Sequence, residues 1–449
     1  MGSNGGTGPT VATVTNSAKG YLVRRSTRLC LAVLLTALTL LAAGCGGGSA
    51  DGPVKLTFWT WAPNMDKVVA VWNEKHPDIQ VTVNKQDGGD PAVTKLLTAV
   101  KAGKGAPDIM QAEYQKIPTL VSAGALADIS KDVPTSATGQ FGTAELRAVD
   151  LGSKALYAVP QDTGPLAFFY RADVFQRLGI AVPTTWQQYA AAARQIHQAD
   201  PTMYLGTFSA NDAGWFAGLA QQAGASWWAT KGQTWSVDID SAATRKVADF
   251  WGGLVQEGVI DNKPMYTPAW NAALNDGKQV GWVSAVWAPG VLEGNAAKTK
   301  GLWQMAPLPQ WGSTFTDGAW GGSATGVTTQ SQHPEQAAQF ATWLNTDPAA
   351  LKALVSDAGI YPAAKSAQLT TPPAFFSNQS DFYEVAAKGR DAISPFTYGP
   401  NVNAAYNAYN DAFGQAADAK TQSAFGQALT QMQSTTLSNL KSSGFTTSQ

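Results

Sequence analysis

Cysteine, histidine and charge are scarce in this chain of 449 residues. The two cysteines, Cys30 and Cys45, both precede residue 54, where strand and helix patterns begin, so no disulfide can cross-link the folded part of the chain. The three histidines form no cluster in the sequence, and we expect no metal site and no cofactor. Only 14% of residues are charged and the formal net charge is -1, which argues against a nucleic-acid partner because that requires a basic face.

Catalytic signatures are also lacking. No Ser-His-Asp set, phosphate-binding loop or dinucleotide fingerprint occurs in the strand and helix context that it requires, so we expect the protein not to be an enzyme. Hydrophobic residues are plentiful at 44%, enough for two or three globular domains. The sixteen tryptophans are spread along the whole chain, and most of them are expected in the core.

The pattern of residues at the N-terminus is typical of an export signal. Three arginines within 24–28 precede Leu29–Ala43, about fifteen residues without a charge, which is too short for the roughly 20 residues that a membrane-spanning helix needs. Residues 41–45 resemble a bacterial lipoprotein box, although Leu41 stands one place further from Cys45 than usual. We therefore predict a signal peptide at 1–44, lipidation of Cys45 and a flexible Gly-rich tether at 45–52. A secreted protein with a free thiol is the alternative.

Strands and helices alternate from residue 54 onward. Val54–Trp61 has the two-residue period of a strand, and Met65, Val68, Val69 and Trp72 form the apolar stripe of a helix capped by Asn64. Further strands are predicted at 79–83, 107–111, 203–208 and 280–284, and further helices begin at Asp90, Thr184, Asp212, Asp240, Pro334, Pro348 and Asn401. This order predicts doubly wound α/β units, whose ligands bind beyond the carboxyl ends of the strands.

Tyr157–Arg171 interrupts this pattern with two prolines around a single carboxylate, Asp162. Because a central strand does not normally contain two prolines, we interpret the segment as a passage between two compact bodies. Pro307–Gln310 and Gly359–Pro362 are predicted as a second and a third crossing. The expected division is a first lobe of 53–160 plus 308–360 and a second lobe of 161–307 plus 361–449.

Four segments in this order resemble the extracellular solute-binding proteins (family 1) of carbohydrate ABC transporters, of the maltose/oligosaccharide-binding lipoprotein type: Gly105–Ile109, Tyr157–Arg171, Asn275–Trp287, and Gly321–Leu344 with Asp347–Pro362. The resemblance implies a two-lobed periplasmic-binding-protein-like α/β fold of type II, three hinge crossings and a ligand in the interlobe cleft. It further implies an oligosaccharide ligand, two permease subunits and a cytoplasmic ATPase as partners, and a monomer held outside the cytoplasmic membrane by lipid.

Sugar sites combine aromatic platforms with carboxylate and amide groups. Such residues follow the predicted strand ends and crossings, and the ligand-binding candidates are Trp61, Asn64, Glu113, Tyr114, Asp162, Trp215, Trp287, Trp320 and Gly322. The resemblance gives Trp287 a stacking role. Ala112 and Gly164 stand where maltose-binding proteins have Trp and Glu, so maltodextrin specificity does not transfer. Simpler interpretations are core packing for the tryptophans, a surface carboxylate for Glu113 and a turn cap for Asp162.

Three alternatives to oligosaccharide capture stay open at this point. The ligand could be a polar non-sugar solute such as a glycerophosphodiester. A lipid-anchored glycosidase needs two carboxylates across the scissile bond, and Glu113 and Asp162 are available for that role. A lipoprotein adhesin would bind polysaccharide without transport.

Overall fold

The computed structural model describes residues 52–232 and 234–448. The expected signal peptide at 1–44, Cys45 and all of the predicted tether except its last residue lie outside this range. The described residues belong to one contiguous body. Within this part of the chain, every helix is too short or too polar to span a bilayer.

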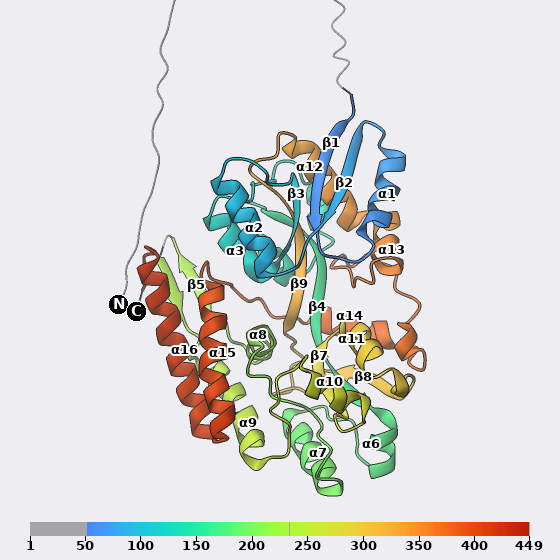
Figure 1. Cartoon of the computed structure of the whole chain (residues 1–449), viewed down its shortest axis with the longest axis vertical. Helices are drawn as coiled ribbons and strands as arrows, with labels where there is room; N and C mark the ends of the chain where they lie inside the picture. The colour runs from blue at the N-terminus through green and yellow to red at the C-terminus, as the bar shows by residue number, and fades with distance from the viewer. Residues whose placement is uncertain (1–51, 233, 449) are drawn as a thin grey trace, which may run out of the picture. The chain divides into compact units, whose positions relative to one another are not determined.

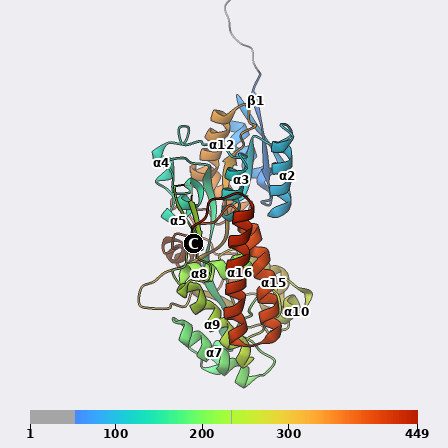
Figure 2. The same cartoon turned by 90° about the vertical axis from the view of Figure 1, so that its left-hand side faces the viewer.

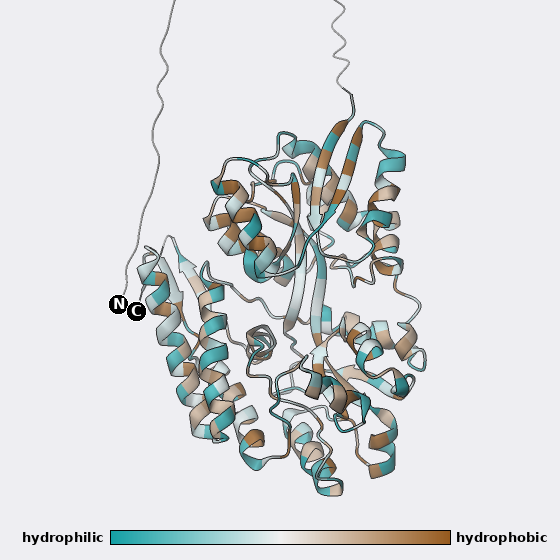
Figure 3. Ribbon diagram, in the orientation of Figure 1, coloured by the Kyte–Doolittle hydropathy of each residue, from teal (hydrophilic) through white to brown (hydrophobic). Residues whose placement is uncertain are grey.

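A mixed parallel and antiparallel sheet organises the first half of this body. Strand β1 (Val54–Thr60) lies between β2 (Ile79–Lys85) and β3 (Ile109–Glu113), and both pair with it in parallel. Strand β9 (Ala319–Val327) pairs antiparallel with β3, and β4 (Ala158–Arg171) pairs with β9. Hydrophobic and hydrophilic residues alternate along β1 and β2 in Figure 3, as expected for strands whose two faces differ in environment.

Helices cover both faces of this sheet. Figure 1 shows α2 (Asp90–Lys101) and α3 (Ile117–Ser122) on one side and α1 (Met65–Lys75) and α13 (Pro348–Ser356) on the other. The predicted apolar stripe of α1 is buried. Asn64 adopts a left-handed conformation and does not cap α1 with its side chain, which donates instead to the Asp357 carbonyl. The remaining elements here are α4 (Thr135–Thr138), α5 (Thr143–Asp150) and α12 (Pro334–Thr346).

Strand β4 is continuous over 14 residues although it contains Pro160 and Pro165. The register with β9 shifts between Pro160 and Asp162 and again between Thr163 and Pro165. Because a proline at an irregular position removes no ladder donor, the shifts allow both prolines to remain within the strand. The C-terminal part of β4 pairs with β7 (Gly281–Ala285) and β8 (Trp303–Pro307), so this one strand belongs to both halves of the molecule.

Two hydrophobic clusters define the two lobes. The first lobe packs around residues such as Leu56 and Phe58, and the second around residues such as Phe168 and Trp282. Along β4, Val159 belongs to the first cluster and Leu166 to the second, so the chain passes between the lobes around Asp162. Nine tryptophans are among the most deeply buried side chains, and all but one of them lie in the second cluster. The two-lobed α/β fold predicted from the sequence is confirmed.

The second crossing lies later in the chain than predicted. Leu308 packs in the second cluster and Gln310 pairs with Thr185, so Pro307–Gln310 belongs to the second lobe. The chain returns to the first lobe along β9, whose antiparallel pairing with β4 carries it across. Gly359–Pro362 lies at the hinge, because Pro362 pairs with Asp162 on β4 and Tyr361 packs in the second cluster while Ala363 and Ala364 pack in the first.

The second lobe is mainly helical. Helix α7 (Trp186–Ala199) begins with a capping box formed by Thr185 and Gln188, one residue later than predicted. The expected strand at 203–208 does not form as a continuous strand. Only Tyr204 and Thr207 pair there, each through an isolated bridge, with Gln279 and Asp261. Figure 2 shows α15 (Val402–Ala419) and α16 (Gln422–Ser442) side by side. The other elements are α6 (Ala172–Leu178), α8 (Ala213–Gln222), β5 (Trp228–Lys231), β6 (Thr234–Val237), α9 (Ala242–Glu257), α10 (Pro268–Asn275), α11 (Ala288–Asn295) and α14 (Phe382–Asp391).

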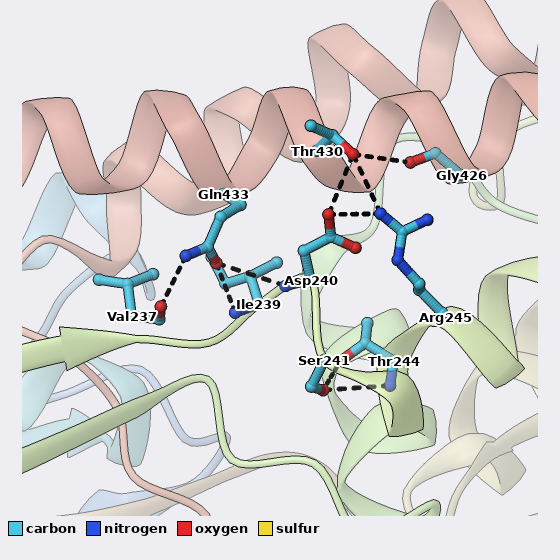
Figure 4. Close-up of polar contacts among 9 residues, drawn as sticks. All are labelled: Val237, Ile239, Asp240, Ser241, Thr244, Arg245, Gly426, Thr430 and Gln433. Carbon is cyan, nitrogen blue, oxygen red and sulfur yellow. Dashed lines mark hydrogen bonds and ion pairs between the residues drawn. The ribbon is translucent and has the colours of Figure 1, made fainter. Parts of the chain in front are cut away.

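Asp240 anchors α16 and does not cap α9. Ser241 is the cap, because its hydroxyl accepts the Thr244 amide. The Asp240 carboxylate accepts a bond of 2.6 Å from Arg245 and one of 3.0 Å from Thr430 on α16, as Figure 4 shows. This network joins the C-terminal helix to the body of the second lobe.

Candidate functional site

A cavity of about 320 Å³ is lined by residues of both lobes. The first lobe contributes the end of β3 and the start of α2, and the second lobe contributes the start of α8 and one face of α15. Strand β9 passes along the cavity between them. Carboxylates, amides and aromatic rings dominate the lining, which consists of Asp90, Glu113, Gln115, Lys116, Asn211, Asp212, Ala213, Gly214, Ala319, Trp320, Gly321, Tyr398, Asn403, Tyr406, Asn407 and Asn410.

Lys116 is the only basic residue that lines this cavity. Its ammonium donates to the Asp90 carboxylate at 2.6 Å and to the Asn403 side-chain oxygen on α15. The side chain is only 7% exposed, so few water molecules compete with these two partners. Lys116 therefore joins the two lobes, and its charge is balanced before any ligand enters.

Two carboxylates of the lining come from opposite lobes. Burial raises the pKa of Glu113, and the nearby Lys116 charge partly opposes that rise. Burial raises the pKa of Asp212 to about 7, against hydrogen bonds from the Trp215 amide and the Trp320 side chain that lower it. Asp212 also caps α8, since its side chain accepts the Trp215 amide. These carboxylates can accept hydrogen bonds from a polar ligand.

Trp320 lines the cavity and packs against Trp287. The Trp287 indole donates a hydrogen bond of 2.9 Å to the Trp320 carbonyl, and the two ring centroids are 4.7 Å apart at 67°. Trp287 lines a separate groove of about 760 Å³ between α11 and α13. The tryptophan predicted to stack on a ligand is therefore half-buried beside this groove and is not part of the cavity lining, so its stacking role stays a prediction.

Asp162 lies where all three crossing segments meet. Its carboxylate accepts a 2.6 Å bond from the Ser323 hydroxyl on β9, and its backbone pairs with Pro362. The Tyr114 hydroxyl donates to the Asp162 carbonyl at 2.9 Å. Burial raises the pKa of Asp162 to about 6, although the bonds from Ser323 lower it. Asp162 is absent from the cavity lining, so its contacts are those of the hinge.

Gly322 is required by the same hinge. Its φ is +94°, and an added Cβ would lie 2.8 Å from the Tyr114 ring. Tyr114 itself is buried and lines a small cavity of about 30 Å³ beside the hinge. Both residues hold the crossing strands together, and neither lines the larger cavity.

Three other predicted site residues lie elsewhere. Trp215 is a core side chain, 1% exposed, whose indole donates to the Val283 carbonyl, so it lies in the core and not in the cavity lining. The Trp61 ring packs over Gly88. Asn64 is exposed and bonded to Asp357. Of the nine candidates, only Glu113 and Trp320 line the cavity.

Sequence reasoning missed the contribution of α15. Asn403, Asn407 and Asn410 stand at i, i+4 and i+7, which places them on one helical face together with Tyr406. A stripe of amides at helical spacing, where a solvent-exposed face more often carries charges, was the available signal. Gln115 and Lys116 directly follow the predicted Glu113 and Tyr114, and Asp90 and Asp212 were interpreted only as helix starts.

The cavity suits a polar, uncharged molecule. Amides both donate and accept, carboxylates accept from hydroxyls, and Trp320, Tyr398 and Tyr406 supply ring surfaces. Among residues 52–232 and 234–448, no group of three or more His, Cys, Asp or Glu residues is placed to hold a metal ion.

One protein family accounts for most of this chain. The model of the bacterial extracellular solute-binding proteins matches residues 59–351. The chain belongs to this family. The solute-binding protein is 24% identical over 391 residues to an arabinooligosaccharide-binding protein of Bacillus subtilis, covering 82% of this chain and 89% of that protein.

Solved structures agree with the fold. The solute-binding protein is 31% identical to the galacto-N-biose/lacto-N-biose I-binding protein of a Bifidobacterium longum ABC transporter, solved with lacto-N-biose, with a TM-score of 0.78 over 88% of this chain and 99% of that one. A binding protein of Bifidobacterium animalis subsp. lactis, solved with β-1,6-galactobiose, is 24% identical with a TM-score of 0.74, covering 89% and 100% of the two chains.

Proposed function

We propose that this solute-binding protein captures a neutral oligosaccharide between its two lobes, delivers it to an ABC importer and does not hydrolyse it. The observation that carries the proposal is the cavity lining, in which amides, carboxylates and aromatic rings from both lobes surround a space without a free cation. Hydrogen bonds to the carboxylates fix sugar hydroxyls, and ring surfaces contact the apolar faces of the sugar. The relatives named above for their carbohydrate ligands support the same class of ligand.

An anionic ligand such as a glycerophosphodiester fits the cavity poorly. Phosphate sites normally use Arg, Lys or a free helix N-terminus. Lys116 is bonded to Asp90 and Asn403, and the N-terminus of α8 carries the Asp212 carboxylate. A phosphodiester would therefore meet the Glu113 and Asp212 carboxyl groups with no free cation in the lining to balance its charge.

Delivery implies two permease subunits and a cytoplasmic ATPase as partners of a monomeric, lipid-anchored protein outside the cytoplasmic membrane. A ligand that contacts both lobes shifts the protein toward its closed state, and the permease recognises that closed state. The anchor is the lipidated Cys45, followed by a tether that keeps the lobes near the membrane.

Thermal-shift measurements with a panel of galacto- and arabino-oligosaccharides and lacto-N-biose test the proposal. At about 100 times the Kd a ligand stabilises the folded protein by about 2.7 kcal/mol, which is readily measured. A variant with Asn407 and Asn410 both replaced by Ala should respond less, and Gln415→Ala, an exposed amide of the same helix outside the cavity, should respond like the original protein. Stabilisation by phosphodiesters alone would contradict the proposal, as would sugar products released during incubation with a stabilising ligand.

A further inference from the structure

The cavity is small for a chain of sugars. Its volume of about 320 Å³ lies at the lower end of the usual range for ligand pockets, about 300–1,000 Å³. The residues that line it come from both lobes and from β9, so the ligand is surrounded on several sides. A long oligosaccharide fits such a space only if it can extend out between the lobes.

Two polar contacts close one side of the cavity. Lys116 on the first lobe donates to Asn403 at the start of α15, and both side chains line the cavity. Three residues after Lys116, in α3, the Thr119 hydroxyl donates to the Pro400 carbonyl at 2.9 Å. No sugar ring can pass between side chains that are hydrogen bonded to each other. We call Lys116, Asn403, Thr119 and Pro400 the lobe clasp.

We propose that the lobe clasp limits ligand length, so that this protein binds a mono- or disaccharide and discriminates against longer chains of the same sugar. This inference rests on the proposed carbohydrate-binding function and names the size class of the ligand. A longer chain has to separate Lys116 from Asn403 in order to leave the cavity on this side, and it then loses the contact between the lobes.

The burial of Lys116 makes the clasp costly to open. The Lys116 side chain is 7% exposed, so its ammonium has little access to water and needs its two protein acceptors. The Asp90 side chain is 62% exposed, so water can replace Lys116 as its partner. Hydrogen bonds to charged groups are the stronger kind, so forcing the clasp open should reduce affinity about tenfold or more.

Titration calorimetry with galactose, β-1,6-galactobiose, galactotriose and galactotetraose tests the length limit. For the original protein, the affinity should be highest for the mono- or disaccharide and at least about tenfold lower for the trisaccharide. Lys116→Ala should reduce this difference to about threefold or less. Asn403→Ala opens the clasp from the other lobe and should have the same effect if Lys116→Ala fails to fold. Lys67→Ala, an exposed lysine of α1 outside the cavity, should leave the length preference unchanged.

Equal or rising affinity with chain length in the original protein would overturn the length limit while leaving the proposed function intact. The same holds if neither clasp variant changes the difference between di- and trisaccharide. Mass spectrometry of a co-purified saccharide provides a ligand-independent check, and three or more sugar units would likewise overturn the limit. If no saccharide of the series or of the wider panel binds, the proposed function fails and the length limit fails with it.

Discussion

The Ser323 hydroxyl donates a hydrogen bond of 2.6 Å to the Asp162 carboxylate, and this bond joins the two strands that cross between the lobes. Asp162 lies on β4 and Ser323 on β9, and the Gln111 side chain of the first lobe donates to the same Ser323 hydroxyl at 2.9 Å. Burial is the main reason why the pKa of Asp162 is raised, and the Glu113 charge adds to it. The hydroxyl of the next residue, Thr163, donates a hydrogen bond to the Glu145 carboxylate. The hinge is therefore a buried polar network, and burial raises the pKa of the carboxylate at its centre to about 6.

Replacing Asp162 by Asn should flatten the dependence of stability on pH. Burial raises the pKa of Asp162 to about 6 in the folded protein, whereas an unfolded Asp titrates near about 4. Between these values the folded protein holds a proton that the unfolded chain has released, so this group makes the free energy of unfolding fall as pH rises from about 4 to about 6. Urea unfolding at several pH values should show a smaller fall for Asp162→Asn. An unchanged slope would mean that Glu113 or Glu145 causes it.

Ligand affinity should depend on Asp212. Its pKa of about 7 means that the carboxyl becomes protonated as the pH falls below neutrality, and a neutral carboxyl is a weaker acceptor for sugar hydroxyls. Affinity measured by calorimetry should therefore decrease as pH falls through about 7. Asp212→Asn should bind more weakly at pH 8 but without that pH dependence, and it should remain folded because Asn also caps helices. A pH dependence that persists in the variant would assign it to another group.

Trp215→Phe should lower stability and leave affinity unchanged. The indole nitrogen donates to the Val283 carbonyl in the core, and losing that bond leaves a buried carbonyl unsatisfied at a cost of about 1–3 kcal/mol. Thermal unfolding and calorimetry on the same preparation separate the two effects. Weaker ligand binding at unchanged stability would restore Trp215 as a ligand contact.

Gly322→Ala should destabilise the hinge by about 1–3 kcal/mol. The backbone at Gly322 has a φ of +94°, and the new Cβ would press on the Tyr114 ring. Gly312→Ala is the matched control, because a Cβ at that position meets nothing within 4 Å. Thermal unfolding should show a clear loss for the first variant and little change for the second. Equal stability of the two variants would show that the hinge adapts to a side chain at Gly322.

Cys45→Ser should release the protein from the membrane, because the thiol is the expected site of the lipid. Fractionation of cells that express each form measures the effect. Retention of the variant in the membrane fraction would contradict lipid anchoring at this position, and a matched Cys30→Ser variant should remain in place.

Much of the fold could be predicted because its signals are local. The apolar stripe of α1, the alternation of β1 and the proline-rich crossing at Asp162 follow from residues near one another in the chain. The position of the second crossing could not be predicted in this way. Leu308 and Trp320 both pack in the second lobe, and only the pairing of β9 with β4 shows where the chain crosses.

The candidate site was harder to predict than the fold. A tryptophan after a strand end looks the same in the sequence whether it lines a cavity or packs in the core, because both environments favour a large ring. Trp320 lines the cavity, Trp215 is buried in the core and Trp287 lines the groove between α11 and α13. The amides of α15 were missed because a helix near the C-terminus gives no local sign that it faces the end of β3.

The sequence alone determined the fold class, the resemblance to carbohydrate-binding proteins and the segment where the chain first crosses between lobes, because periodicity, prolines and motif order are properties of the chain itself. Only the tertiary structure decided which polar groups share a cavity. Lys116 and Asn403 are 287 residues apart in sequence, and their contact exists because two separately packed lobes bring their surfaces together. The same packing decided that Asp162 bonds Ser323 across the hinge and does not line the cavity.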